Sequence, residues 1–368
     1  MAKLDRVLAD PDVVSVQELA LATRNHGMPL EAMHYDITPV GLHYLLHHYD
    51  IPALDPVGFR LRLGGRVRTP LELSLAELRD RPAMTVPVTM ECAGNGRARM
   101  APRPLSQPWL DEAIGTGEWT GCSLAALLDD AGLLDDAVDV VCCGADRGTE
   151  GGIEQRYQRA LPVAEARRPE VLLAYALNGA PLPPQHGFPL RLVVPDWYGM
   201  ANVKWLTDIE VIDRTYDGFQ QTHAYRFRHD VDDDGTPLTR MRPRALMVPP
   251  GIGDFPSRAR QLVLGPTVLH GRAWSGSAAV ESVEVSTDDG TTWAPATLDP
   301  PVGEHAWCAW SHRWEPPSPG DYRLACRARD AAGDAQPGSA DWNTGGYANN
   351  AVQRITVTVV DANGVAPT

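Results

Sequence analysis

Cysteine is scarce in this chain, and the spacing of the few cysteines excludes the common cysteine motifs. Six cysteines occur among 368 residues, and no two of them form a C-x-x-C pair. A zinc ribbon and a thioredoxin-type redox motif are therefore excluded. So few cysteines in a chain of this length also exclude a fold that depends on a disulfide framework.

Positive charge and long apolar segments are lacking as well. The formal net charge is -14, which argues against nucleic acid or an anionic membrane as a partner. No apolar run approaches the roughly 20 residues needed to span a bilayer. Residues 1–20 show no apolar leader segment, twin arginine or small-residue cleavage site. We therefore expect a soluble, cytoplasmic protein, in which an anionic substrate would need a local basic pocket.

Glycine (33 residues) and proline (32 residues) are abundant, which favours turns and strands over long helices. In the first two-thirds of the chain, short helices and strands are mixed without the regular alternation of a doubly wound sheet, which indicates an α+β fold. The predicted elements are strands over 59–67, 85–90 and 190–194, a helix with a capping box at Ser74, a helix over 123–130 ended by Gly132, and a hairpin over 171–183 with Asn178-Gly179 at its turn.

The character of the sequence changes near Arg244. Residues 248–253 read Val-Pro-Pro-Gly-Ile-Gly, which resembles a linker, and the remainder is nearly all strand. Short strands over 279–286, 291–296, 307–314, 322–330 and 351–360 suggest a β-sandwich of the immunoglobulin-like kind. The chain is thus predicted to contain two domains, over residues 1–243 and 244–368.

Cys92 lies in the loop Glu91-Cys-Ala-Gly-Asn-Gly-Arg97, directly after a predicted strand. The glycines allow a bulky group to approach the backbone, and Arg97 and Arg99 favour the thiolate form of the cysteine. From the loop alone, a buried structural cysteine is the commoner interpretation, because free cysteine is among the most buried residue types. The local chemistry does not name a metal.

The Cys92 loop resembles the cysteine loop of the sulfite oxidase family. Further motifs that resemble this family occur in its order from about residue 20 to residue 360. They are Arg24-Asn25-His26, Pro108-Trp109, Trp119-Thr-Gly121, Asn178-Gly179, His186-Gly-Phe-Pro-Leu-Arg191, Val203-Lys204-Trp205-Leu206, Gly271-Arg-Ala-Trp274, Asp288-Asp-Gly-Thr-Thr-Trp293 and Asn350-Ala-Val-Gln-Arg354. So many motifs in one order make a chance similarity very improbable.

The resemblance implies a molybdenum-molybdopterin cofactor, one per chain, with Cys92 as the protein ligand of the metal. Soft sulfur ligands suit such a metal. The residues that match cofactor-binding positions are Asn25, His26, Asp146, His186, Arg191 and Lys204. Arg191 and Lys204 are also sensible partners for a phosphate group.

The resemblance also implies an anion pocket and a substrate. Arg24, Arg97 and Arg354 match the arginines that line the family's oxyanion pocket, and Trp109 and Tyr216 match its aromatic substrate-site residues. We therefore expect sulfite to be oxidised to sulfate. The second domain would be a dimerisation domain, so we expect a homodimer. Because Arg354 lies in that domain, we expect the domain to close over the pocket.

Three departures from the family pattern bear on the substrate rather than the cofactor. Gly96 stands where many members carry an arginine, Gln353 where a histidine is common, and Ala201-Asn202 replaces a more basic pair. We expect no haem domain, because there is no room for one before Arg24, so electrons would leave to an external acceptor or to dioxygen. Two alternatives stay open: the same cofactor acting on a sulfoxide or nitrate, and a cofactor-free binding module.

Overall fold

The computed structural model describes residues 7–8, 13–230 and 232–361, and it divides into two compact units. The first unit contains the described residues up to Met28, Pro39–Thr239 and Trp342–Asn349. The second contains Pro29–Thr38, Arg240–Asp341 and the described residues from Asn350 onward. Each unit is therefore discontinuous, whereas the predicted division at residue 243 is linear.

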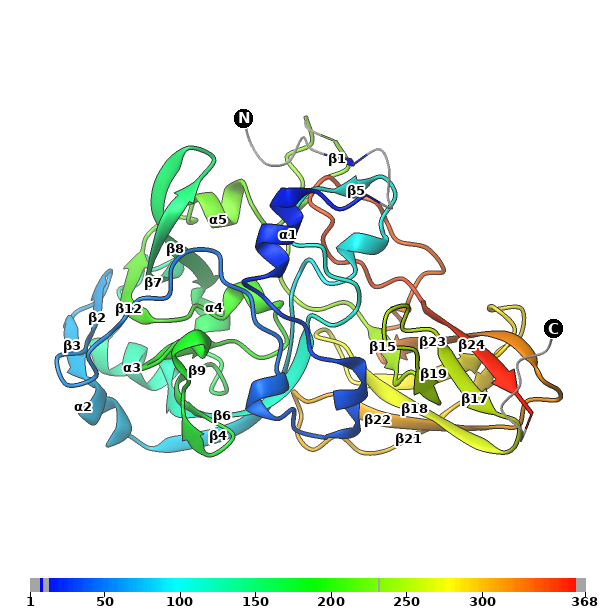
Figure 1. Ribbon diagram of the computed structural model, residues 1–368. Helices are drawn as coiled ribbons and strands as arrows, with labels where there is room; N and C mark the ends of the chain where they lie inside the picture. Colours follow the sequence, from blue (N-terminus) through cyan, green and yellow to red (C-terminus); the bar gives the residue numbers. More distant parts are fainter. Residues whose placement is uncertain (1–6, 9–12, 231, 362–368) are drawn as a thin grey trace. The chain divides into compact units, whose positions relative to one another are not determined.

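Two five-stranded sheets form the framework of the first unit (Figure 1). One is antiparallel and contains β4 (Ala83–Glu91), β6 (Ile114–Ser123), β9 (Leu172–Leu177), β10 (Ala180–Pro181) and β11 (Arg191–Val193). The other has the order β3 (Leu71–Ser74), β2 (Arg60–Gly65), β12 (Leu206–Ile212), β7 (Asp139–Glu150) and β8 (Ile153–Pro162), and only β2 and β12 are parallel.

The main core of the first unit unites these sheets. Leu63 of β2, Cys142 of β7 and Leu173 of β9 belong to one buried cluster, which also takes Leu127 and Leu128. The last two lie on α3 (Leu124–Ala131), which ends at Gly132 in a positive-φ conformation, as the sequence predicted. The predicted capping box at Ser74 is also confirmed and begins α2 (Leu75–Arg79).

The remaining helices of the first unit are short. They are α1 (Val16–Ala22), α4 (Val163–Ala166), α5 (Phe219–Thr222) and the 3-10 turns η3 (Val40–Leu42), η4 (Arg97–Arg99), η5 (Pro184–His186) and η6 (Gly199–Ala201). Two small ribbons join β1 (Val7–Leu8) to β5 (Arg103–Pro104) and β13 (Arg226–Phe227) to β14 (Thr236–Pro237). Sheets with few short helices confirm the predicted α+β class.

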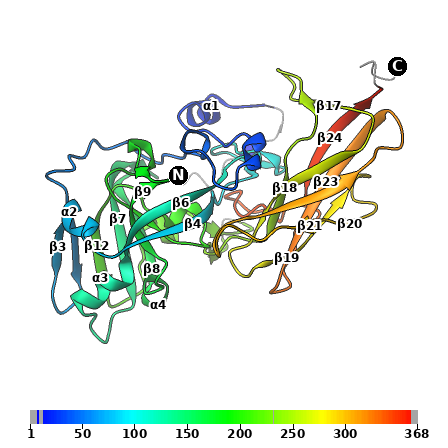
Figure 2. The same cartoon turned by 90° about the horizontal axis from the view of Figure 1, so that it is seen from below.

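The second unit is a sandwich of two sheets, and β23 and β24 run side by side in Figure 2. The four-stranded sheet has the order β15 (Arg244–Met247), β18 (Thr267–Trp274), β22 (Cys308–Trp314) and β21 (Thr297–Leu298). The six-stranded sheet has the order β16 (Ile252–Gly253), β17 (Arg260–Val263), β24 (Gln353–Val360), β23 (Gly320–Asp330), β19 (Val280–Ser286) and β20 (Ala294–Pro295). Residues from both sheets share one core, and the immunoglobulin-like type of this sandwich stays a prediction.

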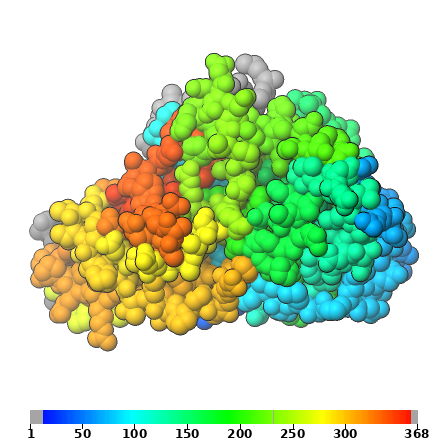
Figure 3. Space-filling model, turned by 180° about the vertical axis from the view of Figure 1, so that it is seen from behind, coloured from blue at the N-terminus to red at the C-terminus, as the bar shows by residue number. Residues whose placement is uncertain are grey.

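Two segments join a unit that is remote from them in sequence. Residues 29–38 include the 3-10 turn η2 (Leu30–His34) and join the second unit, where Arg272 Nε donates to the carbonyl of Met33 at 2.8 Å. Residues 342–349 return to the first unit, where the amide of Thr344 donates to the carbonyl of Arg228 at 2.9 Å. In Figure 3 the orange-red colour marks this stretch of the chain, including residues 342–349 of the first unit.

Two details of the predicted second domain are corrected by the structure. The linker-like stretch over 248–253 lies within the second unit, because Pro249, Pro250 and Gly251 form the turn between β15 and β16. The predicted strand over 291–296 shrinks to Ala294–Pro295. Its first residues are held in a turn, since the Asp288 carboxylate accepts bonds from the amide and the hydroxyl of Thr292.

Among the described residues, none of the helices has the length and apolar character that a bilayer crossing requires.

A buried ion pair in the first unit generates a stability prediction. Glu18 of α1 and Arg103 of β5 are both buried, and their side chains approach to 3.1 Å. Replacing Glu18 with alanine removes the carboxylate that Glu18 places beside the buried guanidinium, so we expect a loss of about 3–5 kcal/mol in the free energy of unfolding. Urea denaturation followed by circular dichroism measures this change.

The control is Asp136→Ala, which removes an exposed ion pair with Arg66 from the same unit. Exposed pairs contribute roughly 0–1 kcal/mol, so this variant should unfold close to the wild-type midpoint. Equal effects from the two substitutions would contradict the role assigned to the buried pair.

Candidate active site

Cys92 follows β4 directly, and its loop is fixed by hydrogen bonds to the start of β6. The amide of Cys92 donates to the carbonyl of Ala113 at 2.9 Å, and the amide of Asn95 donates to the carbonyl of Cys92 at 2.9 Å. The side chain of Asn95 donates to Glu91 at 3.0 Å and accepts from the amide of Ala113 at 3.0 Å. The loop therefore presents the thiol from a rigid support rather than from a mobile connection.

The glycines of this loop make room for Arg97. A Cβ atom on Gly94 would lie 2.5 Å from both terminal nitrogens of Arg97, and one on Gly346 would lie 2.6 Å from its Cγ. Gly96 has φ 84° and would meet Asn349. A side chain at position 96 is strained in this conformation, which gives a physical reason for the missing arginine there.

Burial controls the protonation of the Cys92 thiol. Burial raises its pKa, while Arg97 and the Trp109 side chain lower it in part. The predicted effect of cationic neighbours is therefore present but outweighed. Arg99 contributes little to it, because its guanidinium pairs with Asp111 at 2.6 Å. In this setting a bound metal cation is what would stabilise the thiolate.

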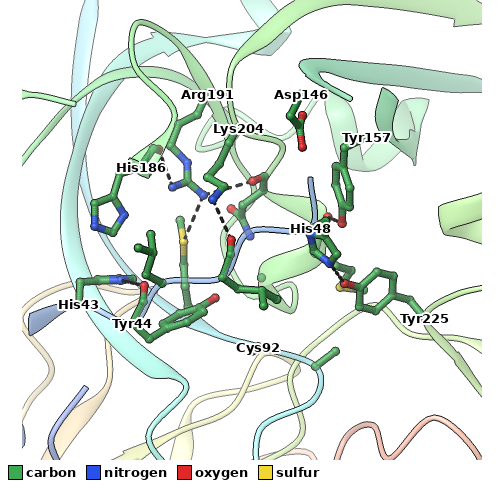
Figure 4. A pocket seen from close by; sticks show the side chains of 17 residues that line it. His43, Tyr44, His48, Cys92, Asp146, Tyr157, His186, Arg191, Lys204 and Tyr225 are labelled. Carbon is green, nitrogen blue, oxygen red and sulfur yellow. Dashed lines mark hydrogen bonds between the residues drawn. The ribbon is translucent and has the colours of Figure 1, made fainter. Parts of the chain in front are cut away.

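One cavity of the first unit, with about 660 Å³ of empty space, extends from Cys92 to a cluster of cations (Figure 4). We call it the first cavity. Its walls include Cys92, Asp146, His186, Arg191 and Lys204, five residues that the family resemblance assigned to the cofactor. Asp146 lies on β7, Arg191 on β11 and His186 on η5, while Cys92 directly follows β4 and Lys204 lies just before β12.

The two cationic side chains are anchored on backbone carbonyls. Arg191 donates to the carbonyls of His186 at 3.0 Å and Asn202 at 3.2 Å, and its guanidinium lies 4.5 Å from the ring centre of Trp119. Lys204 Nζ donates to the carbonyls of Leu46 at 2.8 Å and Gln185 at 3.2 Å. None of these partners carries a charge, so the cavity keeps its positive potential.

The pKa values of the side chains in this cavity are shifted by their burial toward the neutral forms. Burial lowers the pKa of Arg191 to about 10, and burial together with Arg191 lowers that of Lys204. Burial, with His43 and Arg191 adding to it, lowers the pKa of His186 to about 2. Asp146, which supplies the carboxylate among the described residues of the cavity, has its pKa raised by burial to about 6 despite Lys204.

Several buried polar atoms of this region have no hydrogen-bond partner among the described residues. They are Nε2 of His43, Oδ1 of Asp146 and Nδ2 of Asn202, all on the first cavity, and Nε2 of His47 beside it. Buried polar atoms without partners carry a free-energy cost unless a ligand or water satisfies them. An anionic, hydrogen-bonding ligand fits this set, and the phosphate and pterin of a molybdopterin have that chemistry.

A second cavity shares part of its wall with the first. It encloses about 1120 Å³ of empty space, counted to its open mouth, and both cavities are lined by Leu46, His48, Cys92 and Tyr225. Arg97 and Trp109 lie on the second cavity only. Nε of Arg97 donates to the carbonyl of Gly345 at 2.9 Å and Nη1 to that of Gln107 at 2.9 Å, while Nη2 makes no hydrogen bond within the described residues.

The other predicted site residues do not line either cavity. Arg24 is exposed and donates to the carbonyl of Tyr49 at 2.6 Å, and His26 is exposed. Asn25 is buried and supports the cavity wall indirectly, since it accepts from the amide of His47 at 2.7 Å. The roles of Arg24 and His26 in binding stay predictions.

Tyr216 and Arg354 also have local partners. The hydroxyl of Tyr216 donates to Gln158 at 2.8 Å. Arg354 lies in the second unit and pairs with Asp289 at 3.0 Å. Its predicted approach to the anion pocket stays a prediction. Of the three predicted pocket arginines, the first unit places Arg97 next to Cys92.

Several lining residues were not found from the sequence. They include His43, Tyr44, His47, His48, Tyr157, Asn202 and Tyr225. One signal was available: the run His43-Tyr-Leu-Leu-His-His-Tyr49 contains three histidines and two tyrosines in seven residues. In the structure His48 hydrogen-bonds the hydroxyl of Tyr225 and stacks on the ring of Tyr157 at 4.7 Å. Tyr225 itself lies 177 positions away, and no local pattern marks it.

Comparison with known proteins agrees with this site. Residues 48–220 match the oxidoreductase molybdopterin binding domain, and residues 257–360 match the Mo-co oxidoreductase dimerisation domain. These matches define the class, a molybdopterin oxidoreductase that carries a dimerisation domain. Sulfite oxidase of Gallus gallus is 35% identical over 334 residues, which cover 86% of this chain and 72% of that protein. The chain belongs to the sulfite oxidase family.

Other relatives widen the comparison. Mitochondrial sulfite oxidase of Mus musculus is 35% identical over 88% of this chain, and the match spans 62% of that protein's length. An NADH nitrate reductase of Ulva prolifera is 29% identical, and the match covers 95% of this chain and 44% of the length of that reductase. The sulfane dehydrogenase SoxCD of Paracoccus pantotrophus has the same fold, with a TM-score of 0.77 at 24% identity over 97% of this chain and 95% of that one.

The close approach of the Arg97 guanidinium to Gly94 generates a second prediction. Gly94→Ala adds a methyl group where the guanidinium lies, so Arg97 must move or the loop must shift. We expect the variant to fold, to lose about 1–3 kcal/mol of unfolding free energy, and to bind anions more weakly. Thermal unfolding and titration with sulfate report both effects. Gly41→Ala is the control, because a Cβ at Gly41 meets nothing within 4 Å.

Buried histidines generate a pH prediction for the cofactor-free protein. The pKa of His43 is lowered by burial to about 4 and that of His186 to about 2. Between pH 6.5 and 4 these histidines bind protons in the unfolded chain but stay neutral in the folded chain. The free energy of unfolding therefore falls as the pH falls. Asp146 and Glu112, whose pKa values burial raises, oppose this trend, while His47, whose pKa burial lowers to about 4, adds to it.

Urea denaturation at pH 7 and pH 5 measures this effect. We expect the folded state to be less stable at pH 5, by on the order of 2 kcal/mol for each fully buried histidine. His43→Gln, which cannot titrate, should weaken the dependence. Unchanged or greater stability at pH 5, with no difference between wild type and His43→Gln, would contradict the prediction.

Proposed function

We propose that this chain oxidises sulfite to sulfate with a molybdenum-molybdopterin cofactor. The observation that carries the proposal is the position of Cys92 on the shared wall of two cavities, one lined by buried cations and the other by Arg97. The family membership supports the cofactor. The similarity to nitrate reductases as well as sulfite oxidases makes the choice of substrate the part that experiment must decide.

The residues of the first cavity have a clear role in this proposal. Cys92 would donate its thiolate to the metal, and His186, Arg191 and Lys204 would hold the phosphate and the pterin. Arg191 and Lys204 offer charge-assisted hydrogen bonds, which are the stronger kind. Asp146 and Asn202 would satisfy their unpartnered atoms on the pterin. When bound, the cofactor supplies two-electron oxygen-atom transfer, which the side chains of this protein cannot perform.

The second cavity would bind and orient the substrate. Nη2 of Arg97 is available to a sulfite oxygen, because its other nitrogens are fixed on Gly345 and Gln107. The flat guanidinium lies 5.2 Å from the ring centre of Tyr347, which limits its movement. Overall, sulfite and water give sulfate, two protons and two electrons, and an external acceptor or dioxygen takes the electrons.

Three further parts of the proposal concern the whole protein. Arg24 and Arg354 would add to the anion pocket, and Tyr216 would hydrogen-bond near the metal. The dimerisation domain would join two chains in a homodimer. Cytoplasmic localisation also stays a proposal. The alternatives are reduction of nitrate or a sulfoxide by the same cofactor, and assays with those substrates on the loaded protein separate them from sulfite oxidation.

Removal of the metal ligand tests the proposal directly. Protein from a molybdopterin-competent host should contain about one molybdenum per chain and oxidise sulfite with ferricyanide as the acceptor. Cys92→Ser should lose at least 100-fold in kcat, because a hydroxyl is a poor ligand for a soft-sulfur site. Cys122→Ser, at a buried cysteine outside both cavities, is the control. Full activity in Cys92→Ser would eliminate the proposed metal ligand.

Arg97 tests substrate binding. Hydrogen bonds to charged groups contribute about 1.5–3 kcal/mol, so Arg97→Met should lower kcat/KM for sulfite roughly 10- to 150-fold. Arg99→Lys serves as the control, because the neighbouring arginine pairs with Asp111 and lines neither cavity. A kcat/KM within twofold of wild type in Arg97→Met would remove this arginine from the substrate site.

A further inference from the structure

The wall of the second cavity includes many residues besides Cys92 and Arg97. The described residues that line it include Leu21 of α1, Leu105 and Phe219 of α5. A sulfite ion held at Arg97 contacts only a small part of this wall. The remaining wall is available to the rest of a larger substrate.

The walls of this cavity are largely apolar. Leu21, Leu46, Leu105 and Phe219 contribute side chains that cannot hydrogen-bond to an inorganic oxyanion. The ring of Phe219 is stacked on that of His223, with centroids 5.2 Å apart and planes 3° apart, so it offers a fixed aromatic surface. Apolar walls gain free energy by covering apolar ligand surface and gain nothing from sulfite.

The charges of the cavity favour a single negative group at one place. Among the described residues that line this cavity, Arg97 is the only arginine or lysine, and it lies near Cys92. Glu150 also lines it and accepts hydrogen bonds from Tyr49 at 3.3 Å and Gln220 at 2.9 Å. A carboxylate in the same cavity opposes a second negative charge on the ligand. A monoanion with its charge beside Arg97 suits this arrangement better than a dianion.

We infer that the second cavity accepts an organic sulfinate, R–SO2⁻, whose carbon group lies on the apolar walls. This inference rests on the proposed oxygen-atom transfer at the same site and changes its substrate. The sulfinate oxygens take the place of the sulfite oxygens at Arg97, and the sulfur keeps a lone pair. The sulfinate and water give the sulfonate R–SO3⁻, two protons and two electrons, and two one-electron acceptors such as ferricyanide are reduced.

A neutral sulfoxide fits less well, because it makes no use of the buried guanidinium. Nη2 of Arg97 forms no hydrogen bond within the described residues, and a buried cation needs a counter-charge. A sulfinate supplies one charge, two hydrogen-bond acceptors and an apolar group in one molecule. These three features correspond to Arg97, its free nitrogen and the wall formed by Leu105 and Phe219.

The test compares substrates on the molybdenum-loaded enzyme with ferricyanide as the acceptor. Sulfite, methanesulfinate and benzenesulfinate share the reacting sulfur and differ in the carbon group. Burial of the phenyl ring should raise kcat/KM of benzenesulfinate over methanesulfinate by roughly 10- to 150-fold. Equal values for the two sulfinates would overturn the inference, as would a higher kcat/KM for reduction of a neutral aryl sulfoxide.

A cavity variant and a matched control locate the effect. Phe219→Ala should lower the ratio of benzenesulfinate to sulfite kcat/KM about tenfold, and Leu105→Asn should do the same if the first variant fails to fold. Phe255→Ala removes an exposed phenylalanine of the second unit and should leave the ratio unchanged. Calorimetric titration with benzenesulfonate, the product, should show weaker binding to Phe219→Ala by a similar factor. An unchanged ratio in both cavity variants would overturn the inference.

The two proposals fail separately in this design. Turnover of sulfite without turnover of either sulfinate overturns the inference and leaves sulfite oxidation standing. Turnover of benzenesulfinate without turnover of sulfite supports the inference and overturns sulfite oxidation. No turnover of any of the three by enzyme that contains molybdenum overturns both.

Discussion

Buried positive charge without matching negative charge is the constraint around which the first unit is organised. Arg191, Lys204, and two histidines whose pKa burial lowers, His43 and His186, face the first cavity, whose described lining includes the carboxylate of Asp146. The protein holds these cations with carbonyl oxygens rather than carboxylates, which fixes their positions and leaves their charge available. Such an arrangement is unfavourable until an anion arrives, so folding stability has been exchanged for affinity toward the cofactor.

Cys92 gains its importance from its place in the wall rather than from its own reactivity. Burial raises the pKa of its thiol, so the free protein has little thiolate to offer. The thiol nevertheless reaches both cavities from a loop fixed by Asn95. A metal bound there would stand between the cation cluster and Arg97. The geometry therefore separates holding the cofactor from holding the substrate, with one residue common to both tasks.

The sequence predicted the elements that local chemistry determines and missed those that depend on distant contacts. Capping at Ser74, the helix end at Gly132 and the Asn178-Gly179 hairpin are local, and all three are present. Cys92, Asp146, His186, Arg191 and Lys204 were found because they resemble family motifs. Tyr225 and Asn202 reach the cavity only through tertiary packing. Arg24 and His26 match a motif and are exposed, and their assignment to the site stays a prediction.

The return of residues 342–349 to the first unit has a consequence for the order of synthesis. Arg97 is held by the carbonyl of Gly345, 248 positions later, and the amide of Ala348 donates to the carbonyl of Ala93 at 2.7 Å. A ribosome releases the N-terminal part of a chain first, and an ordinary N-terminal domain folds while the remainder is still being made. Here the loop that carries Cys92 lacks these supports until residues 342–349 have emerged. The loop is thus completed only after the strands β15 to β23, which precede residue 342, have been made.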